Sequence, residues 1–258
     1  MKKILLFLFK KESIIIKYLS FSKNAYENIK VILPFVKSNK LIFILNIIKS
    51  AHFVKFQTDI KNEQEYFKKK YLFNHNDWFS SNFNIWKKFL KHLEKIKYLE
   101  IGTFEGRSAV FVGELKNTKE ITCVDNFKGN DEPGFKSDHI NFNFDQVYEN
   151  CLKNLKKTNV FFNLIRDKSD NFFLDNNEKF NVIYIDGSHY YEDLKNDFIN
   201  SKNCLEKNGI LICDDFLCFP YKKKEDNPIV AILECYNKYK NNLEVLFIHR
   251  QIIFKNVN

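Results

Sequence analysis

With 258 residues, 45% of them hydrophobic, and only 7 Gly and 4 Pro, the chain can bury a large core, which excludes a disordered or collagen-like protein. That length suits one large domain, or one domain with an appendage. Residues 1–97 hold 20 Lys, no Arg and 7 acids (net +13), whereas residues 98–258 are net −4. Nucleic-acid readers favour Arg, and the three here, Arg107, Arg166 and Arg250, make that class of partner a poor fit.

The first 75 residues have the pattern of helices. Apolar residues recur at three- and four-residue spacing in residues 14–21 and again in residues 41–48, and Pro34 interrupts the pattern between them. We predict a basic helical N-terminal appendage over residues 1–75. Its lysines leave two interpretations open: they solvate the outer faces of the helices, or they meet an anionic membrane surface or an acidic partner.

No segment has the length of a membrane span or of a signal-peptide core. The apolar run Ile4 to Phe9 is short, and no other window approaches the roughly 20 residues that cross a bilayer. The six cysteines form no Cys-x-x-Cys pair, so the sequence indicates neither a zinc site nor a disulfide framework. We expect a cytoplasmic protein. Peripheral membrane contact through the basic segment and assembly into a homo-oligomer stay open.

A second unit, residues 76–258, begins after a polar break. Asn74, Asn76 and Asp77 form this break and are candidates to cap a helix over Trp78 to Leu93, whose aromatic residues suggest one buried face. Beyond it, short apolar runs alternate with helical segments. Strands are expected at 98–101, 121–124, 160–165, 182–185, 210–213, 243–248 and 252–254, and helices at 107–116, 144–157, 191–206 and 229–239.

This alternation predicts an α/β fold. Strands separated by helices form a parallel sheet with helices on both faces, and such sheets bind ligands at the carboxyl ends of their strands. The last two strands have no helix between them, so they should form an antiparallel hairpin. We therefore predict a Rossmann-like, doubly wound, mostly parallel seven-stranded sheet with a C-terminal antiparallel hairpin.

The first predicted strand runs into the turn Gly102-Thr103-Phe104-Glu105-Gly106 and then a helix. Two glycines let the backbone approach a ligand. The N-terminal amides of the helix that follows would point at an anionic group. The spacing Gly-x-x-x-Gly differs from the dinucleotide and phosphate-loop patterns, which disfavours NAD and ATP. Asp125 ends the next strand, where a carboxylate can accept hydrogen bonds from ribose hydroxyls. Each residue alone could be structural, but together they favour a nucleoside-containing ligand.

Acids follow two further strands. Asp186 ends one, and Asp214 and Asp215 end the next, so all three should converge on the edge that holds Gly102. Gathered carboxylates repel one another, and a hard divalent cation, Mg²⁺ first, would offset the repulsion; separate caps of turns are the alternative. His189 lies three residues after Asp186 and is a candidate general base, although an isolated histidine is more often structural.

From about Asp77 to Phe254 the chain resembles the class I S-adenosylmethionine-dependent methyltransferases, in particular the metal-dependent sugar and macrolide O-methyltransferases and, more distantly, the catechol enzymes. Four motifs carry the resemblance in order: Leu-Glu-Ile-Gly-Thr-Phe-Glu-Gly-Arg-Ser-Ala at 99–109, Val-Asp at 124–125, Ile-Asp-Gly-Ser-His at 185–189 and Cys-Asp-Asp-Phe at 213–216. The N-terminal third matches none of them.

The resemblance implies a role for each matching position. S-adenosylmethionine would be held by Glu100 and Gly102 at its methionine end and by Ser108 at its carboxylate, with Gly106 in the turn. Asp125 would bind the ribose, Ser169 would lie near the adenine, and Asp186 would line the cofactor site. The metal would be held by Asp186, Asp214 and Asp215, while His189 stands where sugar enzymes have a catalytic histidine.

The leading hypothesis is thus a divalent-metal-dependent O-methyltransferase acting on a hydroxyl of a small molecule or a sugar. Metal coordination lowers the pKa of the hydroxyl, so a base such as His189 can remove its proton. One alternative is a nucleic-acid N-methyltransferase, but Asp186-Gly187-Ser188-His189 is not the Asn/Asp-Pro-Pro-aromatic motif of that class. Another is a catalytically inactive cofactor-binding or membrane-associated assembly protein.

Overall fold

The computed structural model describes residues 14–129 and 142–258, and the apolar run at residues 4–9 lies outside these ranges. Its centre is a seven-stranded sheet with the order β3-β2-β1-β4-β5-β7-β6. The strands are β1 (Ile96–Ile101), β2 (Thr118–Val124), β3 (Phe161–Ile165), β4 (Phe180–Ile185), β5 (Leu205–Cys213), β6 (Leu243–Ile248) and β7 (Ile252–Asn256). The first five are parallel, and β7 runs antiparallel to β5 and β6. The predicted fold, including the C-terminal hairpin, is confirmed.

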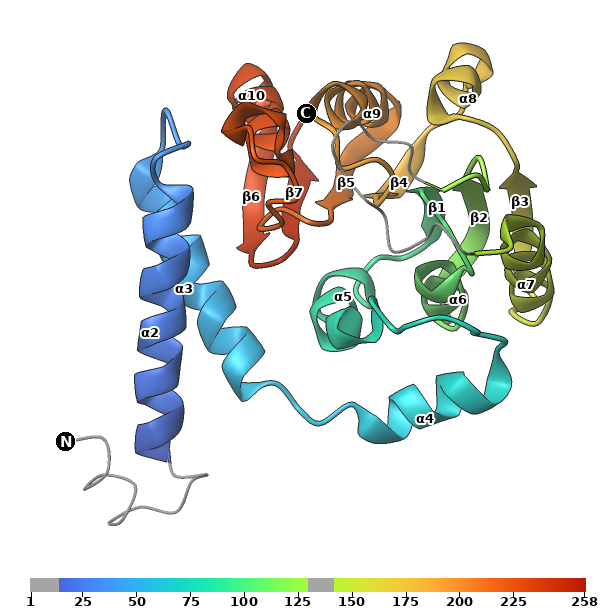
Figure 1. Cartoon of the computed structure of the whole chain (residues 1–258), viewed down its shortest axis with the longest axis horizontal. Helices are drawn as coiled ribbons and strands as arrows, with labels where there is room; N and C mark the ends of the chain where they lie inside the picture. Colours follow the sequence, from blue (N-terminus) through green and yellow to red (C-terminus); the bar gives the residue numbers. More distant parts are fainter. Residues whose placement is uncertain (1–13, 130–141) are drawn as a thin grey trace.

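Helices cover both faces of the sheet (Figure 1). One face carries α8 (Ser169–Asp175), α9 (Tyr191–Cys204) and α10 (Pro228–Tyr239), and the other carries α5 (Phe83–Leu90), α6 (Arg107–Gly113) and α7 (Phe144–Lys156). Side chains alternate across the strands, so Leu99 and Ile101 join the core under α9 and α10, whereas Tyr98 joins the core under α5 and α6. This alternation also points Glu100 toward α6.

Three helices precede the sheet: α2 (Ile14–Ile32), α3 (Lys40–Phe56) and α4 (Lys61–Lys70). In Figure 1, α2 and α3 form a hairpin beside β6, and α4 crosses below α5 and α6. Phe43 and Ile47 of α3 are fully buried in the core that contains α10, and Phe67 of α4 packs in the core that contains α6. The basic segment therefore shares both cores with the sheet. The domain boundary near residue 75 stays a prediction.

Helix α3 also covers the outer edge of the sheet. The Ile248 N–H at the end of β6 donates to Ser50 Oγ of α3 (2.9 Å). An uncovered edge strand presents unpaired amides that pair with other chains, and this contact satisfies one of them. Among the described residues, no helix is long and apolar enough to cross a membrane.

One helix prediction needs correction, and one helix was missed. The helix expected over 78–93 is a 3₁₀ turn (Ser80–Asn82) followed by α5 alone, and Trp78, expected in the buried face, is 52% exposed. The reason is the cap: Asp77 Oδ1 accepts from the N–H groups of Phe79 (3.2 Å) and Ser80 (2.8 Å), so the chain turns before the helix begins. Helix α8 was not predicted, because its seven residues contribute no fully buried side chain and give no apolar period.

Candidate active site at the carboxyl ends of the strands

The predicted site residues follow strands whose ends are tied to one another. The N–H of Gly102 donates to Val124 O (2.9 Å), that of Asp125 to Ile165 O (3.1 Å), that of Asp186 to Ile101 O (2.8 Å) and that of Asp214 to Ile185 O (2.9 Å). Each of these residues therefore continues the ladder one step past its strand. The glycine turn, Asp125, Asp186 and Asp214 consequently share one edge of the sheet, as predicted.

The turn after β1 requires its glycines. Gly102 has φ +83°, and a Cβ there would lie 2.2 Å from the carbonyl oxygen of Asp186. Gly106 has φ +77° and precedes α6, and a Cβ there would lie 3.1 Å from Cys151 Sγ. Phe104 between them is also left-handed, at φ +51°. The turn brings the end of β1 against the end of β4 too closely for any side chain at position 102.

Glu100 and Ser108 meet beneath this turn. Both are buried, and Ser108 Oγ donates to Glu100 Oε1. Burial of the carboxyl group raises the pKa of Glu100 to about 8, an effect that the hydrogen bond from Ser108 opposes. A cationic group bound beside Glu100 would favour its ionised form and release a proton. The pair suits a ligand with a positive charge at this end of the turn.

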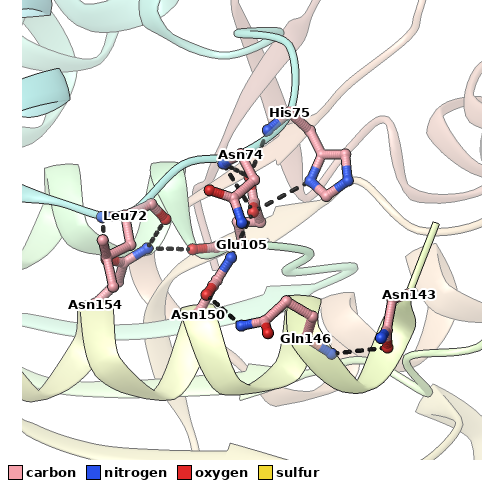
Figure 2. A network of polar contacts seen from close by, with 8 residues as sticks. All are labelled: Leu72, Asn74, His75, Glu105, Asn143, Gln146, Asn150 and Asn154. Carbon is pink, nitrogen blue, oxygen red and sulfur yellow. Dashed lines mark hydrogen bonds and ion pairs between the residues drawn. The ribbon is translucent and has the colours of Figure 1, made fainter.

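Glu105, inside the turn, holds it to two other parts of the chain (Figure 2). Its carboxylate accepts from the N–H groups of Asn74 (3.0 Å) and His75 (3.2 Å), from Asn150 Nδ2 of α7 (3.0 Å), and lies 3.1 Å from His75 Nδ1. The side-chain amide of Asn154 donates to the carbonyls of Leu72 (2.8 Å) and Glu105 (2.9 Å). The segment 72–75 is thus fixed to the glycine turn and to α7 by buried polar contacts.

We expect Glu105→Ala to destabilise the protein by about 3 kcal/mol, because it leaves buried amide donors without an acceptor. Urea unfolding followed by circular dichroism measures this. Glu149→Ala, an exposed acid on the same helix as Asn150, is the matched control and should change little. Equal unfolding midpoints for the two variants would show that Glu105 does not fix the segment 72–75.

Asp125 reaches back to the glycine turn. Its Oδ2 accepts from the N–H of Phe104 (2.8 Å) and its Oδ1 from the N–H of Phe127 (2.7 Å). The carboxylate is half-buried, and both oxygens are oriented by the backbone. The glycine turn and the end of β2 are therefore in contact, and the ribose role of Asp125 stays a prediction.

The acids after β4 and β5 share a tyrosine. Tyr184 lies on β4, two residues before Asp186, and its hydroxyl contacts Asp186 Oδ2 (2.8 Å) and, more closely, Asp214 Oδ2. Gln251, between β6 and β7, donates from Nε2 to the same Asp214 oxygen (2.7 Å) and accepts at Oε1 from Trp86 Nε1 (2.9 Å). A buried polar chain therefore runs from α5 through the hairpin to the acidic cluster.

His189 pairs with Asp215. Its Nε2 lies 2.7 Å from Asp215 Oδ2, and the N–H of Asp215 donates to Asp214 Oδ1 (2.8 Å). Asp215 adopts φ +50°, an uncommon conformation for a residue with a side chain, which marks a constrained turn. A small cavity is lined by His189 together with Asp186, Asp214, Asp215, Leu194 and Pro228.

The charges of these acids act on one another. Burial and the charges of Asp214 and Asp215 raise the pKa of Asp186 well above its ordinary value. Burial and the charge of Asp215 raise the pKa of Asp214 to about 6, against the hydrogen bonds from Tyr184 and Gln251. Both carboxyl groups therefore retain protons at a higher pH than free aspartate does. A cation placed among them would reverse this shift.

The donor chemistry suits a hard cation, but the cluster is engaged with protein partners. Tyr184 and Gln251 contact Asp186 and Asp214, and His189 contacts Asp215. In the part of the chain that the structure describes, no group of three or more His, Cys, Asp or Glu side chains is arranged to hold a metal ion. Cation binding would require these contacts to exchange, and the metal site stays a prediction.

Ser169, the residue predicted near the adenine, lies on α8. It is the first residue of this helix, and its side chain lowers the pKa of Asp197 on α9, against the effect of burial. Asp197 is almost fully buried, and burial raises its pKa to about 7. Helix α8 packs against α9. The adenine role of Ser169 stays a prediction.

Sequence reasoning missed five residues that position the site: Glu105, Tyr184, Gln251, Trp86 and Asp197. Tyr184 carried a signal, because residues two apart on a strand share a face and place its hydroxyl on the side of Asp186. Gln251 and Trp86 are far from the motifs in sequence, and only the hairpin and α5 bring them to the acids.

Comparisons with known proteins match the part of the chain that holds this site. A family model described as a methyltransferase domain matches residues 99–216, from β1 to just past Asp215. This range contains the glycine turn, Asp125, and the acids with His189. A curated relative, the uncharacterized protein R132 of Acanthamoeba polyphaga mimivirus, is 25% identical over 170 residues, which span 63% of this chain and 73% of that protein.

Solved structures share the fold. An O-methyltransferase from Bacillus cereus, in complex with SAH, is similar with a TM-score of 0.52 and 11% identity, over 81% of this chain and 96% of that one. The O-methyltransferase TomG from Streptomyces achromogenes, involved in tomaymycin synthesis and solved with SAM, has a TM-score of 0.50 and 10% identity, over 81% of this chain and 95% of that one. At these identities the likeness concerns the fold.

Proposed function

We propose that this chain, a class I S-adenosylmethionine-dependent methyltransferase, transfers a methyl group to a hydroxyl of a small molecule or a sugar, and that a divalent cation assists. The observation that carries the proposal is the His189–Asp215 pair beside Asp186 and Asp214, at the sheet edge that also holds the glycine turn. O-methylation needs a base, acidic groups and a bound cofactor close together. This edge of the sheet carries a candidate for each. The O-methyltransferase neighbours support it through the shared fold.

The residues around the glycine turn suit S-adenosylmethionine. Gly102 and Gly106 allow the tight turn between β1 and α6, Glu100 offers a buried acid toward a positive group, and Ser108 lies beside it. Asp125, oriented by two backbone amides, offers carboxylate oxygens to ribose hydroxyls. Asp186 would complete the site at the methionine end, and Ser169 is proposed near the adenine.

We assign the proton transfer to His189. Asp215 holds the imidazole through Nε2, and the ring would take up the proton of the acceptor hydroxyl. The acceptor oxygen attacks the methyl carbon as that proton leaves. An oxygen–carbon bond forms while the sulfur–carbon bond breaks, and the electron pair returns to sulfur as a neutral thioether. Asp215 stabilises the imidazolium that results.

A divalent cation, Mg²⁺ first, would be held by Asp186, Asp214 and Asp215, and would lower the pKa of a hydroxyl bound to it. This arrangement explains why three acids are placed at adjacent strand ends, since burial and mutual repulsion otherwise raise the pKa of Asp186 and Asp214. Tyr184 and Gln251 contact two of these acids through hydrogen bonds.

The test is methyl transfer from S-adenosylmethionine with a deuterated methyl group to a panel of sugars, glycans and catechols, read by mass spectrometry. We expect a product labelled on oxygen, loss of product in excess EDTA, and recovery when Mg²⁺ is added back. Undiminished transfer in EDTA would remove the metal, and a label on nitrogen would remove the O-methyltransferase proposal. No transfer by a protein that binds SAH would favour the inactive cofactor-binding alternative.

A further inference from the structure

Helix α3 carries apolar side chains on the face that points away from the domain. Leu41, Ile42, Leu45, Ile48 and Phe56 are 68%, 47%, 47%, 39% and 39% exposed, and we call these five residues the α3 stripe. Positions 41, 45, 48 and 56 share one side of the helix at spacings of four, seven and fifteen residues. The stripe is thus an apolar strip along one side of α3, with His52 between Ile48 and Phe56.

The opposite side of α3 is fixed in the domain. Phe43 and Ile47 are fully buried, Phe43 packs edge-on against Tyr236 at 5.4 Å between ring centres, and Ser50 accepts a hydrogen bond from β6. Ala51 packs in a small cluster with Ala25 of α2. The helix cannot rotate its stripe inward without giving up these contacts. The stripe therefore lacks a covering surface among the described residues of the chain.

The segment of the sequence that carries the stripe is basic. Residues 28–58 contain five lysines (Lys30, Lys37, Lys40, Lys49 and Lys55) and no acid. Lys40 and Lys49, on the same helix as the stripe, are exposed. Apolar side chains flanked by lysines are the composition of helices that lie in the interface of an anionic bilayer.

A second copy of the chain is the competing occupant, and the charge disfavours it. Pairing two such faces would bring two basic segments together. Residues 1–97 of each chain carry a net charge of +13, so the two copies would repel each other. An anionic surface gains from the same charge. We propose that the α3 stripe docks the protein onto an anionic membrane, with the stripe in the interface and the lysines at the headgroups.

The proposal is tested with the full-length protein by sedimentation with vesicles of phosphatidylcholine, with and without about 30% phosphatidylserine. Wild type should bind the anionic vesicles and release from them when salt rises from about 0.05 M to about 0.5 M. The affinity of the variant Leu41→Ser/Leu45→Ser/Ile48→Ser for these vesicles should be lower by a factor on the order of ten or more. Lys40→Gln/Lys49→Gln should lose about fivefold per lysine.

Matched controls separate the stripe from other exposed groups. Leu174→Ser, at an 84% exposed leucine on α8, and Lys222→Gln/Lys224→Gln, at exposed lysines far along the chain, should bind as wild type does. All variants should keep the wild-type melting temperature and SAH affinity.

Three results would overturn the proposal. The first is that the wild type does not bind anionic vesicles. The second is that the triple variant binds them as the wild type does. The third is that vesicle binding is absent and a wild-type dimer becomes a monomer in the triple variant. The last would assign the stripe to a second copy.

Discussion

A His189→Ala enzyme is expected to lose about 10² to 10⁴ in single-turnover rate, the usual effect of removing a general base. The reason is geometric: His189 lines the cavity that Asp186 and Asp214 also line, and its Nε2 is held 2.7 Å from Asp215 Oδ2. The glycine turn and Asp125 follow β1 and β2, whereas His189 follows β4 and pairs with Asp215, so affinity for SAH should stay nearly unchanged. Rapid-quench kinetics with saturating cofactor gives the rate, and calorimetry gives the affinity.

A variant of the neighbouring Asp215 tests the same role of His189. Asp215→Asn keeps the size of the side chain but removes the charge that orients and stabilises the imidazole, so it should lower the same rate by a smaller factor. His92→Ala, at an exposed histidine outside the site, is the control. A His189→Ala enzyme with the wild-type single-turnover rate would make His189 a structural residue.

Asp125→Ala is expected to weaken cofactor binding by about 1.5 to 3 kcal/mol, the range for hydrogen bonds to a charged acceptor. The two backbone amides that hold the carboxylate pre-organise it at the end of β2, so the variant loses an oriented acceptor. Calorimetric titration with SAH measures the change. Asp175→Ala, at an exposed acid on α8, should bind as wild type does.

Asp125 also accepts a hydrogen bond from Phe104 of the glycine turn. A second variant therefore separates the loss of cofactor binding from the loss of structural support for this turn. Asp125→Asn retains an oxygen acceptor for one backbone amide but lacks the carboxylate charge. It should keep most of the thermal stability while losing affinity. If Asp125→Asn and wild type bind SAH equally, the carboxylate does not contact the ribose.

The sequence predicted the sheet because its strands carry the strongest local signal. Runs such as Val182–Ile185 and Ile210–Cys213 are buried on both faces, so they are apolar throughout and easy to locate. Helix ends were harder, because they depend on single contacts. Asp77 caps the chain three residues before Ser80, which shortens the predicted helix and leaves Trp78 exposed.

The site was predictable where it follows a strand and unpredictable where it depends on packing. Gly102, Asp125, Asp186 and Asp214 all continue strands, so topology alone brings them to one edge. Gln251 and Trp86 reach the acids only through the β6–β7 hairpin and α5, and nothing in their local sequence indicates this. The exposed stripe on α3 was equally hidden, since an apolar helix in sequence does not show which side the domain covers.

Calorimetric titration of the purified wild-type protein with SAH tests the central claim most directly. The account predicts saturable binding of one SAH per chain, with heat of binding much reduced in Asp125→Ala and retained in His189→Ala. Absence of heat with both SAH and S-adenosylmethionine, together with saturable binding of NAD, would contradict it, because the turn at Gly102–Gly106 would then serve a different nucleotide.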